Sequence, residues 1–390
     1  MNKTFDNIPL RINFIKDILK NNSLCPLINP DITDTEAFIN TTNAKDTGSV
    51  LNKELLDFND VIKQIGGKLV YIKSGTTGHI FKGLDPDNIS FSNYAVKVSA
   101  YPKKGNYGKQ NDISRPENAE LMMLKVLSYF VVNNQTPHIV LPIGTFNSKI
   151  QPFLNLEKDG IVENDKYTKF IKKYQQNELH DEVSILISEW ANGGDLLEYI
   201  RKNHNNIDPL IWKVTIFQLL SVLTIIQTKY PKFRHNDLKA NNILLHNIGK
   251  LKKNNLFKYK INGCTYIIPN IGFQIKIWDF DFACINGIVN NSKVSAEWTN
   301  KINVNTKRNR YYDVHYFFST LTKKGFCPQF WDSPFIDKSI KDFVKRIIPK
   351  KYRSGDLISK RGRLLVNDEY TTPDKILKED PLFEEFRYKK

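Results

Sequence analysis

The feature that most constrains the fold is a change of hydrophobic pattern at Gly193 and Gly194. Before this pair, most apolar segments are rich in Val, Ile, Tyr and Phe and are separated by turn residues, a pattern that predicts strands. After it, apolar residues recur at helical spacing. The expected strands lie within 68–84, 89–101, 138–146 and 182–190, and the expected helices include 116–132, 195–203 and 209–230. The pattern therefore predicts an α+β fold in which a strand-rich part precedes a helical part.

Composition agrees with a folded protein, because 41% of the 390 residues are apolar and 25% are charged. The longest apolar run, 216–227, is interrupted by Gln and Ser and is too short to span a bilayer, so we expect a buried helix. The N-terminus lacks a basic segment followed by an apolar core, so no secretory signal is expected. The cysteines form no CxxC pair, which favours reduced thiols in an intracellular compartment and no zinc site. They are Cys25, Cys264, Cys284 and Cys327.

The net charge of +16 is the unusual part of the composition. A basic surface can attract nucleic acid, a membrane or an acidic protein. The lysines are dispersed apart from short runs such as 250–260, so a Lys-, Asn- and Ile-rich composition typical of an AT-rich genome is an alternative explanation. No base-reading motif is visible. We therefore expect acidic protein or membrane partners and no specific nucleic-acid recognition.

A glycine-rich turn joins the first two expected strands. Gly75 and Gly78 flank Thr76 and Thr77 in this turn. Glycines at such a place let backbone N–H groups approach phosphate oxygens, since no Cβ stands in the way. A tight hairpin needs the same residues, so the turn alone does not separate a phosphate site from a structural one.

A lysine inside an apolar strand is the next candidate. Lys97 stands in the segment YAVKV. Such a lysine either extends its ammonium to water along the apolar surface or is buried with a charged partner. Glu120, in the helix expected over 116–132, is the candidate partner.

Two polar segments carry the remaining candidates. Residues 235–242 read HNDLKANN between apolar stretches. Here Asp237 can accept a proton from an attacking hydroxyl, Lys239 can neutralise a transferring phosphoryl group, and Asn242 can bind magnesium through its amide oxygen. Asp279 follows an apolar strand and is a second candidate magnesium ligand. Each of these residues also suits an ordinary turn.

The order of these features resembles the signature of the protein kinase superfamily: glycine hairpin, strand Lys, helix Glu, HxDxKxxxN loop and DFx. The resemblance covers roughly residues 65–388. Within it, Asp313 matches the buried aspartate that supports the catalytic loop. The opening at 66–83 and the DFDFA ending at 279–283 are most similar to serine/threonine kinases of large cytoplasmic DNA viruses. That group includes poxvirus virion-morphogenesis kinases and their giant-virus relatives.

The resemblance implies a bilobal kinase-like fold with a small β-rich N-lobe and a larger helical C-lobe. Its parts are an N-terminal extension of uncertain order at 1–60, an N-lobe at 61–190 with an insertion at about 154–182, and a C-lobe at 191–390 with an insertion at about 246–273. It implies catalytic roles for Asp237, Lys239, Lys97 and Glu120, and metal binding by Asn242 and Asp279. The nucleotide-binding residues that it implies are Gly75, Thr76, Thr77, Gly78, Ile80, Ala95, Lys97, Glu189, Ala191 and Asp195.

The activity implied is that of an ATP-dependent serine/threonine protein kinase of viral origin, using Mg²⁺ or, alternatively, Mn²⁺. Lys239, two residues after the catalytic aspartate, favours this reading. The alternatives are a kinase-fold enzyme acting on a small molecule and a catalytically silent scaffold. The partners expected are Ser/Thr-containing protein substrates, including acidic ones, together with peripheral membrane or virion association. The location expected is the host cytoplasm, with packaging in the virion.

Four departures from the family pattern accompany the resemblance. Lys73 replaces the first glycine of the phosphate loop, and Asn236 replaces the arginine before the catalytic aspartate. Control through an Arg–phosphothreonine pair is therefore not expected. Asp281 replaces the glycine of DFG. No APE motif is visible, and Glu297 is a weak stand-in for its glutamate.

Overall fold

The computed structural model describes residues 7–20, 24, 26–29, 31, 51, 53–75, 77–84, 93–156, 165–249 and 256–388. The chain forms two compact units. The first, here called the strand unit, comprises residues 9–132 and 141–190. The second, here called the helical unit, comprises 1–8, 133–140 and 191–390. The bilobal arrangement expected from the sequence stays a prediction.

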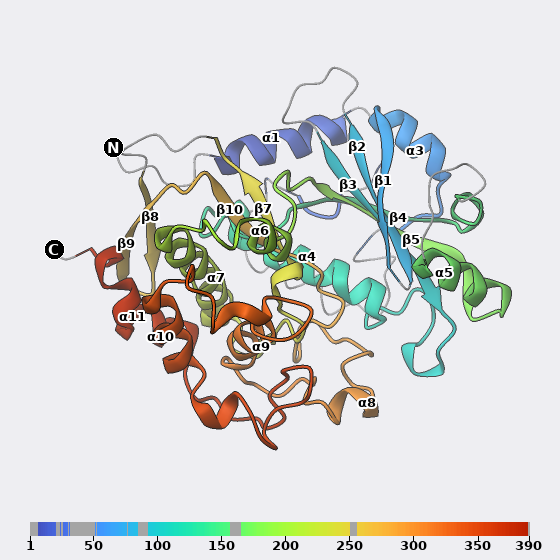
Figure 1. Ribbon diagram of the computed structural model, residues 1–390. Helices are drawn as coiled ribbons and strands as arrows, with labels where there is room; N and C mark the ends of the chain where they lie inside the picture. Colours follow the sequence, from blue (N-terminus) through green and yellow to red (C-terminus); the bar gives the residue numbers. More distant parts are fainter. Residues whose placement is uncertain are drawn as a thin grey trace. The chain divides into compact units, whose positions relative to one another are not determined.

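The strand unit contains a five-stranded antiparallel sheet with the order β1-β2-β3-β5-β4, whose strands are labelled in Figure 1. On β3, buried and half-buried residues alternate, and Val96 and Val98 are almost fully buried. This period of two is what a strand with one face on a core requires. The strands are β1 (Lys68–Ser74), β2 (Gly78–Leu84), β3 (Tyr94–Pro102), β4 (Pro142–Lys149) and β5 (Leu179–Glu189).

The helices of the strand unit include one that matches the sequence prediction, α4 (Pro116–Val132). The other helices in the described part of this unit were not predicted: α1 (Asn7–Lys20), most of which belongs to this unit, α3 (Phe58–Ile65) and α5 (Asp165–Gln175). Asp57 caps α3 by accepting hydrogen bonds from two N–H groups of its first turn, and Gly66 ends it with φ of 88°. The described residues of the N-terminal extension, whose order the sequence left open, and of the insertion at about 154–182 therefore include regular structure.

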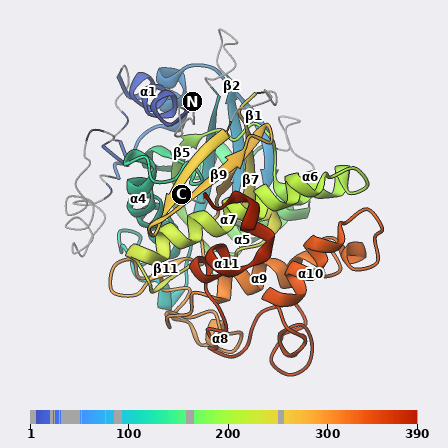
Figure 2. The same ribbon diagram turned by 90° about the vertical axis from the view of Figure 1, so that its left-hand side faces the viewer.

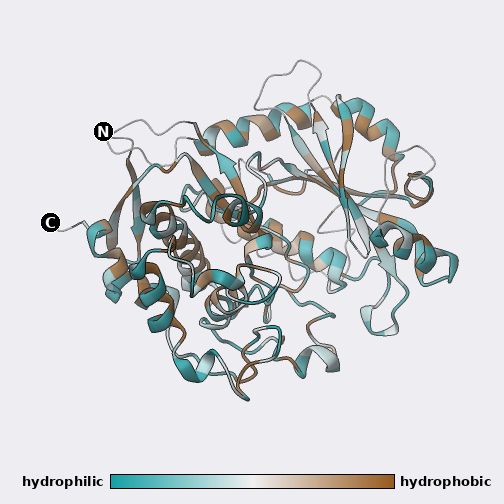
Figure 3. Cartoon of the chain, viewed as in Figure 1, coloured by the Kyte–Doolittle hydropathy of each residue, from teal (hydrophilic) through white to brown (hydrophobic). Residues whose placement is uncertain are grey.

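The helical unit is organised around α7 (Pro209–Lys229), whose N-cap is Asp208. Figure 3 shows apolar residues gathered along this helix. By length and composition α7 is apolar enough to cross a membrane, yet 72% of its apolar window is buried inside the protein, as in a core helix. Figure 2 shows α11 lying along α7. The other helices are α6 (Leu196–Asn203), α8 (Glu297–Asn300), α9 (Tyr312–Leu321), α10 (Lys338–Ile347) and α11 (Pro373–Glu379).

Short strands complete the helical unit as three antiparallel pairs, β10 with β7, β11 with β6, and β8 with β9. The β8–β9 hairpin lies in the segment expected as the insertion at 246–273, so the described residues of this segment also form regular structure. The strands are β6 (Phe233–Arg234), β7 (Ile243–Asn247), β8 (Leu256–Ile261), β9 (Cys264–Pro269), β10 (Phe273–Ile277) and β11 (Cys284–Ile285). Within the described residues, Cys264, Cys284 and Cys327 are free thiols, as expected; Cys25 lies outside that part.

The start of β2 carries a buried histidine that links folding to pH. His79 is 1% exposed, its Nδ1 lies 2.9 Å from Ser74 Oγ, and its ring contacts Phe170 with centroids 4.5 Å apart. Burial lowers the pKa of His79 to about 4, from 6.5. The folded protein keeps this ring neutral, whereas the unfolded chain takes up a proton below pH 6.5. Its contribution to stability is therefore present above pH 6.5 and is lost as the pH falls toward 4.

We expect the melting temperature of the protein to fall between pH 7 and pH 4.5, and His79→Leu to reduce that fall. His315, buried in the helical unit with its pKa also lowered to about 4, keeps its own share of the pH dependence. Thermal unfolding followed by circular dichroism over this range measures the effect. His204→Leu, at a partly exposed position, is the control and should retain the slope of the parent. An unchanged slope in His79→Leu would contradict the assignment.

Candidate active site

In the glycine-rich turn between β1 and β2, the packing of the sheet requires a glycine at position 78. A Cβ on Gly78 would lie 1.8 Å from the carbonyl oxygen of Val98 on β3, so no other residue fits. At Gly75 the nearest atom to such a Cβ is 3.7 Å away, and its N–H donates to the carbonyl of Gly78 at 2.7 Å. Thr77 accepts from Ala100 N through its carbonyl at 2.7 Å. Thr76 lies outside the described residues. The close packing of the hairpin on β3 explains why residue 78 is a glycine. Phosphate binding by the turn stays a prediction.

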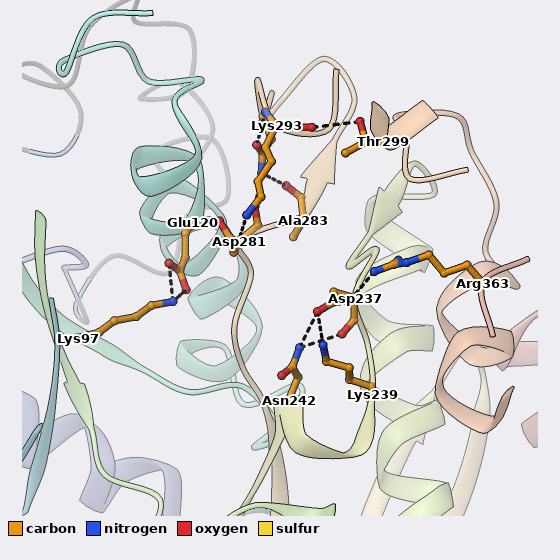
Figure 4. Close-up of polar contacts among 11 residues, drawn as sticks. Lys97, Glu120, Asp237, Lys239, Asn242, Asp281, Ala283, Lys293, Thr299 and Arg363 are labelled. Carbon is orange, nitrogen blue, oxygen red and sulfur yellow. Dashed lines mark hydrogen bonds and ion pairs between the residues drawn. The ribbon is translucent and has the colours of Figure 1, made fainter. Parts of the chain in front are cut away.

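Lys97 and Glu120 form an ion pair between β3 and α4, shown in Figure 4. The ammonium lies 2.6 Å and 2.8 Å from the two carboxylate oxygens, and the side chains are 16% and 7% exposed. Lys97 stands opposite Ile80 on β2. Of the two alternatives for a lysine on an apolar strand, the structure thus contains the paired one. Ala95, two residues earlier on β3, stands opposite Ser188 on β5.

Glu189, at the end of β5, is held by a residue that the sequence analysis did not single out. Arg11 on α1 donates to both carboxylate oxygens of Glu189, from Nε at 2.7 Å and from Nη2 at 2.5 Å. The same carboxylate accepts from the N–H of Leu141 at 2.9 Å. Both charged side chains are nearly buried. A helix of the N-terminal extension therefore fixes a residue that the resemblance assigns to nucleotide binding.

Lys53 is a second residue of the extension that sequence analysis missed. Its ammonium contacts Tyr101 Oη at 2.5 Å, Ser184 Oγ at 2.7 Å and Asn118 Oδ1 at 3.1 Å. Burial lowers the pKa of Lys53 to about 7. Asn118 belongs to α4, the helix that carries Glu120. No motif marks Lys53 or Arg11, because each acts through contacts distant in sequence.

Asp313 on α9 holds the backbone of the polar loop at 235–242 in the helical unit. Its two carboxylate oxygens accept the backbone N–H groups of His235 and Asn236, each at 2.8 Å, and Asp313 is fully buried. Burial raises the pKa of Asp313, while these donors and Arg234 oppose that rise. Asn236 has φ of 63°, a conformation that asparagine tolerates better than most residues. The change from arginine to asparagine thus suits the local backbone.

The carboxylate of Asp237, which is 8% exposed, accepts from Lys239, Asn242 and Arg363 (Figure 4), and the side chain of Tyr316 also hydrogen-bonds it. Oδ2 accepts from Lys239 Nζ at 2.8 Å and from Asn242 Nδ2 at 3.2 Å. Oδ1 accepts from Arg363 Nη2 at 2.6 Å. Burial lowers the pKa of the Arg363 guanidinium, but the neighbouring tyrosines and Asp237 more than offset this, so the pKa is raised overall. The structure therefore brings Asp237, Lys239 and Asn242 together and adds an arginine that the motif does not contain.

The two candidate metal ligands lie on neighbouring segments, since the N–H of Trp278 donates to the carbonyl of Asn242 at 3.2 Å. Asp279, the next residue, has φ of 65°, a rare conformation for a residue other than glycine and one that clusters at functional sites. Because the amide nitrogen of Asn242 donates to Asp237, its amide oxygen faces away from that carboxylate. One carboxylate and one amide oxygen suit magnesium, which takes its other ligands from phosphates and water. Within the described part of the chain, no cluster of three or more His, Cys, Asp or Glu side chains suits a metal.

The remaining sequence candidates have ordinary structural contacts. Asp195 caps α6 by accepting from Glu198 N at 2.9 Å, and Ala191 is buried. Glu297 forms an exposed ion pair with Lys301 at 2.9 Å, a type of pair that contributes little to stability. Lys73 is exposed. Nucleotide contacts by Asp195 and Ala191 stay predictions.

Asp281, which replaces the glycine of DFG, pairs with a lysine of its own segment. Lys293 Nζ contacts Asp281 Oδ2 and lies 4.0 Å from the ring centroid of Phe282. Asn291 Nδ2 donates to the carbonyl of Asp281 at 3.0 Å. The extra carboxylate therefore helps to fold the segment that follows Asp279.

Comparison with known proteins gives the family. The model of the poxvirus serine/threonine protein kinase family matches residues 115–353, and the chain belongs to that family. Over 97% of its length the chain is 50% identical to "Putative serine/threonine-protein kinase R400" of Acanthamoeba polyphaga mimivirus, of which it covers 80%. It is 27% identical, over 60% of its length and 65% of the relative, to "Putative serine/threonine-protein kinase R301" of the same virus. The resemblance to poxvirus and giant-virus kinases is confirmed.

We expect Asp281→Gly to keep phosphotransferase activity within about threefold of the parent. The change removes a partly exposed ion pair, which is worth no more than about 1 kcal/mol. Lys293→Met removes the same pair from the other side and serves as the matched variant. Initial rates of phosphate transfer and melting temperatures measure both effects. An inactive Asp281→Gly protein beside an active Asp279→Asn protein would place the metal ligand two residues further along the chain.

Proposed function

We propose that this protein is an ATP-dependent serine/threonine protein kinase that transfers the γ-phosphate of ATP to protein hydroxyls. Membership of the viral kinase family supports this proposal. The observation that carries it is the carboxylate of Asp237, fixed by Lys239 and Asn242 in the loop HNDLKANN. A silent scaffold is disfavoured because Lys97, Glu120, Asp237, Asn242 and Asp279 are all present in the sequence.

Positioning and charge stabilisation account for most of the catalysis of phosphoryl transfer. In this proposal Asp237 orients the substrate hydroxyl and accepts its proton as the bond to phosphorus forms. Lys239, whose ammonium lies beside Asp237, balances negative charge on the transferring group. Lys97, braced by Glu120, holds the phosphates of ATP.

Asn242 and Asp279 are the residues that would hold Mg²⁺. When bound there, the ion neutralises charge on the phosphate oxygens and fixes their orientation. The role of the chain is to present the amide oxygen and the carboxylate from adjacent segments. Because Asn242 Nδ2 donates to Asp237, the amide oxygen of Asn242 is the atom left to bind the metal.

The proposal extends to partners and location. The substrates are proteins with Ser or Thr residues, and the net charge of +16 favours acidic proteins and anionic membrane surfaces as partners. Dispersed lysines give salt-sensitive and unspecific attraction, so no specific nucleic acid is expected. We place the protein in the host cytoplasm and in the virion. The observation behind this placement is its kinship with viral kinases.

Incubation of the purified protein with labelled ATP, Mg²⁺ and a mixed protein substrate, followed by phospho-amino-acid analysis, tests the activity. We expect phosphoserine and phosphothreonine. Asp279→Asn should abolish transfer, because a charged ligand of the metal is lost. Asp237→Asn should lower kcat by about 10²–10⁴-fold while nucleotide binding stays nearly unchanged. Asp332→Asn, at an exposed aspartate, is the control and should match the parent.

Two results would contradict the proposal. A parent protein that transfers no phosphate to protein, but does phosphorylate small molecules, would identify the alternative enzyme class. Variants of Asp237 and Asp279 that both retain the rate of the parent would show that catalysis does not use this loop.

A further inference from the structure

Arg363 lies in the loop between α10 and α11, far along the chain from the sequence motifs of the site. Its N–H donates to Ser359 Oγ at 2.9 Å, and its carbonyl accepts from Ser359 N at 2.9 Å. Asn303 donates to the carbonyl of Leu364 at 2.9 Å. At Gly362, where φ is 85°, a Cβ would lie 2.9 Å from Ser319 Oγ on α9. The loop is therefore fixed in place before any contact of the Arg363 side chain is considered.

The guanidinium of Arg363 is buried against the catalytic loop, as Figure 4 shows for its contact with Asp237. Nη2 lies 2.6 Å from Asp237 Oδ1. Nη1 donates to the carbonyl of Asn236 and, at 3.2 Å, to the hydroxyl of Tyr312. The ring of Tyr316 lies 4.2 Å from the guanidinium carbon. Arginine is well suited to this place, since its planar fork can bind a carboxylate and a carbonyl while stacking on an aromatic ring.

A purely structural role is the simplest alternative, because buried arginines often hold loops together. Two features speak against it. The carboxylate that Arg363 binds is that of Asp237, and Lys239 and Asn242 bind the other oxygen of the same carboxylate. These donors, together with the side chain of Tyr316, restrict the orientation of the Asp237 side chain. In addition, Arg363 is itself restrained by Tyr312 and Tyr316, so it can transmit the rigidity of α9 to the carboxylate.

We propose that Arg363 is a positioning residue that holds Asp237 in the orientation needed to receive the substrate hydroxyl. This inference rests on the proposed function and deepens it. Asn236 stands where the protein kinase pattern has an arginine, and another arginine, Arg363, reaches Asp237 from a distant loop. Precise placement of a reacting group matters because a displacement of about 1 Å can cost about 10²-fold in rate.

Steady-state kinetics of Arg363→Ala, Arg363→Gln and Arg363→Lys, with Mg²⁺-ATP and one protein substrate, test the proposal. We expect Arg363→Ala and Arg363→Gln to lower kcat by about 10²-fold while the KM for ATP stays within about twofold. Arg363→Lys should recover part of kcat, because it keeps a charged donor but loses the fork. Arg361→Ala, at an exposed arginine of the same loop, should behave as the parent. Circular dichroism checks that each variant is folded.

Several outcomes overturn the inference. The inference is wrong if both Arg363→Gln and Arg363→Lys have the kcat of the parent. These two variants are sufficient for the test if Arg363→Ala fails to fold. A higher kcat would show that Arg363 obstructs Asp237. An equal fall in the control Arg361→Ala would point to a general effect of the loop. An inactive parent would refute the proposed function and this inference together, whereas an active parent with unchanged Arg363 variants would refute this inference alone.

Discussion

The candidate site depends on the hydrogen bonds between its loop and the buried carboxylate of Asp313. This carboxylate accepts two consecutive backbone N–H groups, those of His235 and Asn236, at the point where the loop would otherwise leave both donors without partners. Removal of the carboxylate leaves two backbone N–H groups without acceptors, and removal of the donors leaves a buried charge without partners. Either change is therefore destabilising. The loop shape set in this way directs Asp237 toward Lys239 and Asn242 on one side and toward Arg363 on the other.

The same helix supports the site in a second way. Tyr312 and Asp313 are adjacent on α9, and Tyr316 follows one turn after Tyr312, so these three side chains reach the loop and Arg363 from one rigid element. This helix therefore supports Asp237 in two indirect ways: Asp313 binds the backbone of the two preceding residues, and Tyr312 and Tyr316 contact Arg363, which binds the Asp237 carboxylate. A functional side chain such as that of Asp237 needs neighbours that fix its orientation, and these contacts provide them.

In the strand unit, the N-terminal extension is part of the structure that positions the candidate residues. Arg11 is paired with Glu189, and Lys53 links β3, β5 and α4. Arg11 is buried and Lys53 is half-buried, so their partners offset a desolvation cost that a fully exposed side chain would not incur. The described residues of the extension around Arg11 and Lys53 thus contact the sheet and the helix that carries Glu120.

The sequence by itself determined the local features of this protein. The strands of the five-stranded sheet, the helices α4 and α7, and the loop HNDLKANN follow from periodicity and motif, because these signals lie within short stretches of chain. It did not reveal α3 or the β8–β9 hairpin. These elements lie in or beside segments that were interpreted as an extension and an insertion, and capping by Asp57 and pairing of β8 with β9 stabilise them there.

Only the tertiary structure decided which side chains meet. It showed that Lys97 is paired with Glu120, that Gly78 is required by the close approach of Val98, and that Arg363 binds Asp237. The physical reason is that such contacts join residues far apart in the chain. Their energies depend on burial and distance, and neither quantity can be read from the spacing of residues in the sequence.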